Sequence, residues 1–316
     1  MSDSENGRSE NDAPDQGNRP SIRFSRFHTG QVELNVASVG DPAAPLILCL
    51  HGFPEYWAAW RDVMVDLARD FHVVAPDQRG YNTSSKPAEV SAYRGRPLAA
   101  DIAALADHLS PGRPFVLAGH DWGASVAYAY AFAYPDRLSH LVVANGVHPV
   151  CFQRAVLVDP AQREASQYIN TLRQPATDAR LLEDGCRRAF RMIEGFSPAP
   201  WLTGETREGY RQAWEQPGAM TAMTNWYRAS PIIVPEVGAS APVAPILDAD
   251  PSAFRVTMPH LLLWGEADVA LRPSCIAGLE AFAPDLTNKR FAGAGHWILH
   301  ERPAEVAASI RRLVSA

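Results

Sequence analysis

Long hydrophobic segments are missing from this sequence of 316 residues. Its longest apolar runs, such as those at 46–50 and 261–264, have the length of a strand and fall far short of a membrane span. The stretch from residue 1 to 20 is polar, which excludes a signal peptide and predicts a disordered tail. We therefore expect a cytoplasmic protein without a membrane span.

Basic clusters and paired cysteines are missing as well. The net charge is −6, and Lys and Arg do not cluster in any part of the sequence. Both observations argue against a nucleic-acid partner. The four cysteines lie far apart without a Cys-x-x-Cys pair, a spacing that favours free thiols over a metal site or a disulfide framework. We expect neither a metal nor a cofactor. The cysteines are Cys49, Cys151, Cys186 and Cys275.

Hydrophobic residues make up 47% of the chain, enough for a large core. After a predicted edge hairpin at 22–39, short apolar runs alternate with helical stretches. Strands without polar alternation, separated by helices, predict a parallel sheet covered on both faces. The predicted strands are 46–50, 72–75, 115–118 and 141–144, and the predicted helices are 57–69, 98–109 and 123–134.

This alternation stops near residue 148, and mostly helical sequence follows. Helices are predicted at 161–173, 179–193, 206–214 and 220–229, before an irregular Pro-rich connector at 231–251. The alternation resumes with a strand at 260–264, a helix at 274–282, a strand at 288–291 and a last helix from Pro303. The prediction is a mostly parallel eight-stranded α/β core with a helical cap inserted after the sixth strand. The expected division is tail 1–20, core 21–148, cap and connector 149–255, and core 256–316.

The most informative motif is the pentapeptide Gly119-His120-Asp121-Trp122-Gly123, between a predicted strand and an Ala-rich helix. It matches the small-x-nucleophile-x-small turn of a nucleophile elbow, with aspartate in the place of serine. A carboxylate there attacks saturated carbon, opening a strained ring or displacing a leaving group to form an ester. The alternative is that Asp121 only caps the following helix.

The two residues that assist this nucleophile, an acidic residue and then a histidine, are expected downstream in that order. Asp268 follows the predicted strand 260–264, where the acid that orients the base belongs, with Glu266 as its rival. His296 lies in a Gly-rich loop that lets an imidazole reach the elbow, with His300 as the weaker rival. Asp121, Asp268 and His296 therefore form the predicted triad.

The segment His51-Gly-Phe-Pro-Glu55 follows the first parallel strand and suits a tight turn, with a cis bond before Pro54. The turn is expected to aim the Phe53 N–H at the site. Together with the N–H of Trp122 it would form an oxyanion hole. We interpret His51 as a structural residue that holds the turn.

Five motifs together resemble the epoxide hydrolases of the α/β-hydrolase superfamily, and the match runs from about residue 22 to the end. The resemblance implies that Asp121 attacks an epoxide carbon and that His296, oriented by Asp268, activates the water that hydrolyses the ester. The expected partner is a small hydrophobic epoxide. The motifs are His51-Gly-Phe-Pro-Glu55, Asp77-Gln-Arg-Gly-Tyr81 with Ser84-Ser-Lys-Pro87, Gly119-His-Asp-Trp-Gly123, Trp264-Gly-Glu-Ala-Asp268 and Gly295-His-Trp297.

The family also uses two cap tyrosines to protonate the epoxide oxygen. Asn225-Trp-Tyr-Arg228 resembles the second tyrosine motif closely, which implies that Tyr227 is one acid. Tyr168 resembles the first more loosely. A phenol remains protonated at neutral pH and can serve as an acid; the alternative for each is packing on a helix. Tyr128, Tyr130 and Tyr134 are predicted to be core residues, and Tyr210 has no assigned role.

The main alternative is a haloalkane dehalogenase, which uses the same Asp-His-Asp triad. Trp122 fits the halide site of that family, but Phe53 stands where an Asn donor is common. Trp122 also excludes the fluoroacetate dehalogenase pattern, which has Arg after the nucleophile. A non-catalytic receptor on the same fold would not need an acid, a base and a nucleophile together. The sequence does not determine the oligomeric state, and a homodimer is compatible with it.

Overall fold

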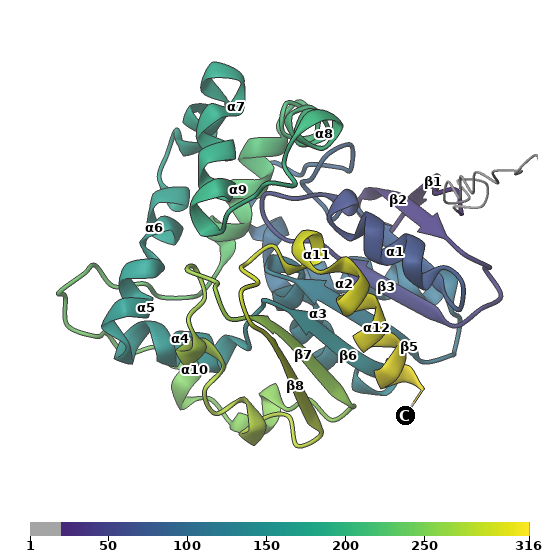
Figure 1. The fold of residues 1–316 in the computed structure, drawn as a ribbon. Coiled ribbons are helices and arrows are strands. Elements are labelled where there is room, and N and C mark those ends of the chain that lie inside the picture. The colour runs from purple at the N-terminus through teal and green to yellow at the C-terminus, as the bar shows by residue number, and fades with distance from the viewer. Residues whose placement is uncertain (1–19, 316) are drawn as a thin grey trace, which may run out of the picture.

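The computed structural model describes residues 20–315, and a mixed sheet lies at the centre of the molecule (Figure 1). Its eight strands follow the order β1-β2-β4-β3-β5-β6-β7-β8. The predicted hairpin is present as β1 and β2. Both its internal pairing and the β2–β4 pairing are antiparallel, whereas all other neighbours are parallel. The strands are Arg23–His28, Glu33–Val39, Leu46–Leu50, His72–Pro76, Phe115–His120, Leu138–Ala144, His260–Gly265 and Leu286–Phe291.

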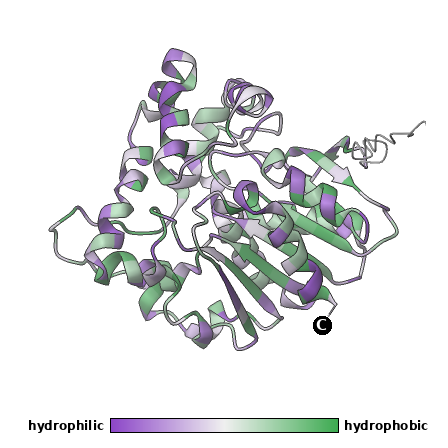
Figure 2. Cartoon of the chain, viewed as in Figure 1, coloured by the Kyte–Doolittle hydropathy of each residue, from purple (hydrophilic) through white to green (hydrophobic). Residues whose placement is uncertain are grey.

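The central strands are mainly apolar, as expected where both faces of the sheet are covered. Strands β3, β4, β5 and β7 are buried at every position, and the sheet is predominantly hydrophobic in Figure 2. Helices α1 and α12 pack together on one face, and α2 and α3 pack together on the other. These four helices are Arg61–Leu67, Pro303–Val314, Gly95–Leu109 and Trp122–Ala133, and the short α11 is Ile298–Glu301.

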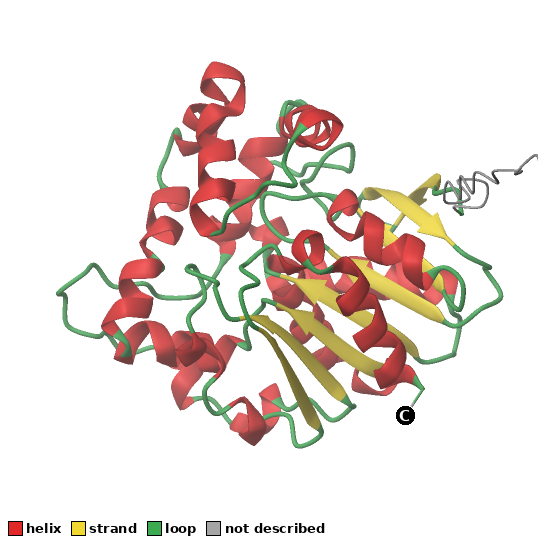
Figure 3. Ribbon diagram, in the orientation of Figure 1, coloured by secondary structure: helices red, strands yellow, loops and turns green. Residues whose placement is uncertain are grey.

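A group of helices, α4 to α9, lies between β6 and β7 in the chain and gathers beyond one end of the sheet (Figure 3). This is the cap that was expected after the sixth strand. The exact domain boundaries remain predictions, and the predicted tail lies, apart from Pro20, outside the described residues. The cap helices are Pro149–Val158, Pro160–Ala165, Gln167–Arg173, Thr177–Phe196, Gly204–Trp214 and Ala219–Ala229, and the connector contains the single turn α10, Pro245–Asp248.

Three predicted helices are not continuous. The helix expected at 161–173 is broken at Ser166, which separates α5 from α6. The buried Ser166 hydroxyl accepts a hydrogen bond from Gln162. The helix expected at 179–193 belongs to α7 but has non-helical backbone at 183–186. The helix expected at 274–282 was wrong: two 3-10 turns stand there, separated by Gly278 with a left-handed φ of 78°.

All four cysteines are free and buried. Tyr128 and Tyr130 are core residues as predicted, but Tyr134 is 39% exposed because it ends α3 at the surface. Within residues 20–315, every helix is too short or too polar to span a membrane.

Candidate active site

Asp121 lies at a sharp turn between β5 and α3, with φ 49° and ψ −117°. The turn forces close packing on both sides. A Cβ on Gly119 would lie 2.5 Å from the carbonyl oxygen of Gly123, and one on Gly123 would lie 2.2 Å from that of Leu50. These contacts explain the small residues two before and two after Asp121. The capping alternative is wrong, because the Asp121 carboxylate makes no capping hydrogen bond to α3.

The Asp121 carboxylate instead faces the turn after β3. The Phe53 N–H donates to Asp121 Oδ1 over 2.7 Å. A Cβ on Gly52 would lie 2.4 Å from the same oxygen, so glycine permits this approach. The bond between Phe53 and Pro54 is cis, as predicted. Trp122, the first residue of α3, begins the helix directly beside the carboxylate.

His296 lies between two carboxylates. Its Nδ1 is 2.7 Å from Asp268 Oδ2, and its Nε2 is 3.7 Å from Asp121 Oδ2. Burial opposes the charged imidazole, but the Asp268 and Asp121 carboxylates outweigh this and raise the pKa of His296 to about 10. Of the rivals, Glu266 is exposed and pairs with Arg290, and His300 bonds to Glu55.

Asp268 is held in place by donors from three segments. Its Oδ1 accepts from the backbone N–H groups of Ala270 and Leu271, at 2.8 and 2.9 Å. Its Oδ2 accepts from Asn145 Nδ2 at 2.8 Å as well as from His296. Asn145, at the end of β6, also accepts from the Gly265 N–H over 2.8 Å. Sequence reasoning missed Asn145; its place at the end of a parallel strand is the signal that could have found it.

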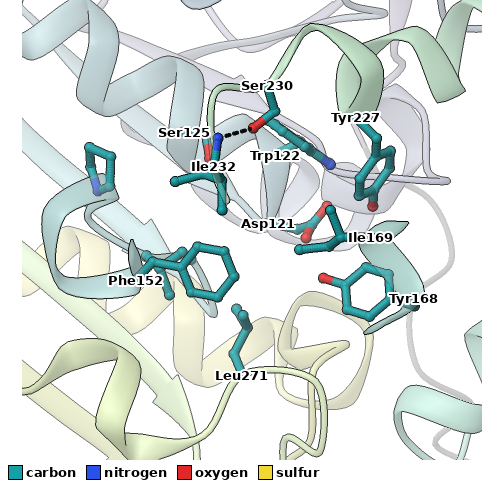
Figure 4. A pocket seen from close by; sticks show the side chains of 13 residues that line it. Asp121, Trp122, Ser125, Phe152, Tyr168, Ile169, Tyr227, Ser230, Ile232 and Leu271 are labelled. Atoms are coloured by element: carbon teal, nitrogen blue, oxygen red, sulfur yellow. Dashed lines mark hydrogen bonds between the residues drawn. The ribbon is translucent and has the colours of Figure 1, made fainter. Parts of the chain in front are cut away.

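Tyr168 on α6 and Tyr227 on α9 both line the cavity above Asp121, and Figure 4 shows their hydroxyls turned toward its carboxylate. Their ring centroids are 6.2 Å apart. Tyr227 packs edge-on against Phe53 and Trp122. Burial, together with the charge of Asp121, raises the pKa of both phenols well above their usual value. Both therefore remain protonated at neutral pH.

The cavity and its opening to solvent together enclose about 560 Å³, and Asp121 is the only charged residue among those that line the cavity. Its walls are mainly aliphatic and aromatic. An uncharged, apolar molecule is the chemistry that fits this surface. The lining residues other than Asp121 and the two tyrosines are Trp122, Ser125, Gly146, Val147, Pro149, Phe152, Ile169, Ser230, Ile232 and Leu271.

His51 holds the turn after β3, as interpreted from the sequence. Its Nδ1 donates to the Gly52 carbonyl over 3.0 Å, and its Nε2 accepts from the Gln78 N–H over 3.1 Å. Burial lowers the pKa of His51 to about 4, so the ring is neutral. Its tautomer follows from its two partners.

A second polar network, centred on Glu55, was missed by sequence reasoning. The Glu55 carboxylate accepts from His120 Nδ1 at 2.8 Å, and from His300 Nε2 and the Tyr210 hydroxyl at 2.9 Å each. Burial alone would raise the pKa of Glu55, but the imidazoles hold it well below its usual value. His120 Nε2 also bonds to the His296 carbonyl over 2.9 Å, which connects this network to the backbone of His296.

No group of three or more His, Cys, Asp or Glu residues within 20–315 could hold a metal ion. The site brings together a carboxylate at a sharp turn, an imidazole paired with an acid, a backbone donor and two phenols.

Comparisons with known proteins agree with this geometry. A family model described as alpha/beta hydrolase fold matches residues 45–180. AB hydrolase superfamily protein YfhM of Bacillus subtilis (strain 168) is 34% identical over 90% of this chain and 95% of its own. Epoxide hydrolase 3 of Xenopus tropicalis is 31% identical over 91% of this chain and 76% of its own.

Solved structures give the same result. A chain from work on novel epoxide hydrolases in metagenomes from hot environments is 36% identical, with a TM-score of 0.85 over 93% of this chain and 99% of its own. Bacillus megaterium epoxide hydrolase, solved with an inhibitor, is 28% identical, with a TM-score of 0.82 over 92% of this chain and all of its own. The chain therefore belongs to the epoxide hydrolases of the α/β-hydrolase superfamily.

Proposed function

We propose that this protein converts a small apolar epoxide and water into a vicinal diol through an ester on Asp121. The observation that carries the proposal is the meeting of three groups: the Asp121 carboxylate and the phenols of Tyr168 and Tyr227 line one apolar cavity, and His296 Nε2 lies 3.7 Å from that carboxylate. The names of its relatives support the same reaction.

In the first step, an Asp121 oxygen attacks an epoxide carbon, and the bond between that carbon and the ring oxygen breaks. The ring oxygen takes a proton from Tyr168 or Tyr227, whose raised pKa values keep them protonated beforehand. The product is a hydroxyalkyl ester of Asp121. The phenols lie on the cap and the nucleophile lies on the core, so the substrate is held between the two.

In the second step, His296 takes a proton from a water that attacks the ester carbonyl carbon. Ester formation removes the negative charge of Asp121, which contributes to the high pKa of His296. The imidazole therefore releases its proton more readily once the ester exists. This proton converts the tyrosine phenolate back to a phenol, and the neutral imidazole is then a base at the stage that needs one. The N–H groups of Phe53 and Trp122 stabilise the negative oxygen of the tetrahedral intermediate. As the intermediate collapses, the departing alkoxide takes the proton of the hydroxyl that came from water, which gives the diol and the Asp121 carboxylate and leaves His296 protonated, as at the start.

A haloalkane dehalogenase uses the same triad but has a different requirement. A halide leaves without a proton, so paired phenols facing the nucleophile have no purpose as acids there. Phe53 also offers no side-chain donor for a halide. Both features favour the epoxide.

Incubation with styrene oxide and, separately, with 1-bromobutane tests this proposal. We expect diol from the first and no bromide from the second. Bromide release without diol would establish a dehalogenase, and neither product would favour a non-catalytic role.

A further inference from the structure

Helix α6 carries a polar residue at every third position, and these residues hold the chain segment that follows Tyr227. Gln167 Nε2 donates to the Pro235 carbonyl over 2.9 Å, and Asn170 Nδ2 donates to the Val234 carbonyl over 3.0 Å. Arg173 is the third member of this row. Residues three apart share a helix face, so one face of α6 binds the segment while Tyr168, one position after Gln167, contributes to the cavity.

Arg173 makes the most extensive contact of the row. Its Nε donates to the Tyr227 carbonyl over 2.9 Å, and its Nη2 donates to the carbonyls of Ser230 and Ile232 over 3.2 and 2.7 Å. These carbonyls lie at and just after the C-terminal end of α9, where a helix leaves its last carbonyls unpaired and a cation is favourable. Ser230 and Ile232 also line the catalytic cavity.

Arg228 makes the reciprocal contact, from α9 to the end of α6. It follows Tyr227 on α9, and its guanidinium donates to the carbonyls of Arg173 and Gln174 at the end of α6, over 3.4 and 3.2 Å. Each arginine therefore binds the C-terminal end of the helix that carries the other. We call this pair of contacts the arginine clasp, formed by Arg173 and Arg228.

We propose that Arg173 is a positioning residue that fixes Tyr168 and Tyr227 relative to each other for ring opening. The proposal rests on the function proposed above. Tyr168 and Arg173 share α6, and the Arg173 side chain bonds to the carbonyl of Tyr227 itself. A planar guanidinium that bonds to three carbonyls leaves the two helices little freedom to slide, whereas an ammonium cannot reproduce this arrangement. The distance between the two phenols therefore depends on this side chain.

The test measures the two chemical steps separately in single-turnover reactions with styrene oxide. In Arg173→Met we expect the rate constant of Asp121 alkylation to fall about 10-fold or more, because small misplacements of catalytic groups are costly. Ester hydrolysis should remain within about twofold of wild type, because His296 and Asp268 are untouched. Arg173→Lys should lie between Met and wild type. Arg188→Met is the matched control: Arg188 is an exposed cap arginine paired with Glu183, and its loss should change neither step.

A double-mutant cycle with Tyr227→Phe separates positioning from general support of the cap. If Arg173 acts through the phenols, Arg173→Met should slow alkylation much less in the Tyr227→Phe background than in wild type. Equal losses in both backgrounds, or no loss in wild type, would overturn the proposal. If Arg173→Met does not fold, the same double-mutant cycle with Arg173→Lys distinguishes positioning from general support of the cap. Failure of the wild type itself to form an ester would instead refute the proposed function.

Discussion

At the scale of single residues, Asp121 has a backbone conformation that few residues other than glycine adopt. The surrounding glycines and the Phe53 N–H hold it there, with the carboxylate directed at the cavity. The conformation belongs to the turn, so a residue of similar shape can replace aspartate without changing the fold.

Asp121→Asn should therefore remain folded and lose turnover, since an amide is a far poorer nucleophile than a carboxylate. Diol formation measures the loss, and slow deamidation should restore activity with time. In wild type, single turnover in heavy-oxygen water should place the label in the Asp121 side chain before the diol. Label in the first diol would show direct attack by water and contradict the ester mechanism.

His296→Gln should form the ester and fail to release it, because attack by Asp121 needs no base whereas ester hydrolysis does. Mass spectrometry of the intact protein should show an increase equal to the mass of one epoxide. A folded variant that gains no mass and makes no diol would show that His296 does not act only as the base of ester hydrolysis.

The pKa of His296, raised from 6.5 to about 10, also makes folding depend on pH. A group with a higher pKa in the folded state stabilises that state fully below its unfolded pKa and loses the effect as pH rises through the folded pKa. The free energy of unfolding of wild type relative to His296→Gln should therefore decrease from about pH 7 to about pH 10. Denaturant titrations at several pH values measure this difference. A difference independent of pH would show that the imidazole is not held in its charged form.

At the scale of helices and strands, both proposed acids lie on cap helices, Tyr168 on α6 and Tyr227 on α9. If Tyr168 and Tyr227 protonate the ring oxygen, Tyr227→Phe should slow alkylation at least about 100-fold, the lower end of general acid catalysis. The double Phe variant should be nearly inactive, while ester hydrolysis proceeds normally. Tryptophan fluorescence is a suitable signal, since Trp122 packs against Tyr227. A double variant that alkylates Asp121 as fast as wild type would show that the phenols only pack.

The elements also show what could be predicted from the sequence. The parallel strands and the elbow were predictable because apolar runs and short motifs are local signals. The break at Ser166 and the left-handed Gly278 were not, because a buried hydroxyl bond and a single backbone angle leave the apolar pattern unchanged. The Glu55 network was missed because its partners are 65, 155 and 245 residues away in the chain.

At the scale of the whole molecule, the end of α7 is attached to the loop that carries His296. Trp297 Nε1 donates to the Ile193 carbonyl over 2.9 Å. Glu301 accepts from the Ser197 hydroxyl at 2.8 Å and from the Gly295 N–H at 2.7 Å. Cap and core are therefore joined beside the proposed base.

Gly295→Ala should force this contact apart, because the added Cβ would lie 2.2 Å from Ser197 Oγ and 2.5 Å from Ser197 Cβ. We expect a loss of about 1–3 kcal/mol in stability, as for other overpacked sites, and slower ester hydrolysis. Thermal unfolding and single-turnover kinetics measure the two effects. Gly195→Ala is the control: it lies in α7, its Cβ would meet nothing within 4 Å, and it should be neutral or slightly stabilising. Equal stability and equal rates of ester hydrolysis in the two variants would show that the Gly295–Ser197 contact is not tightly packed.

The burial of the four cysteines protects their thiols from the proposed substrate. Epoxides are electrophiles that modify accessible thiolates, so an enzyme that handles them is exposed to inactivation by its own substrate. Burial raises the pKa of Cys151 to about 11 and raises those of Cys49, Cys186 and Cys275 as well. Protonated thiols without access to the cavity are poor nucleophiles. In the proposed reaction, the fold thereby leaves Asp121 as the group that the epoxide alkylates, where water hydrolyses the ester, and protects sulfur, where alkylation would be permanent.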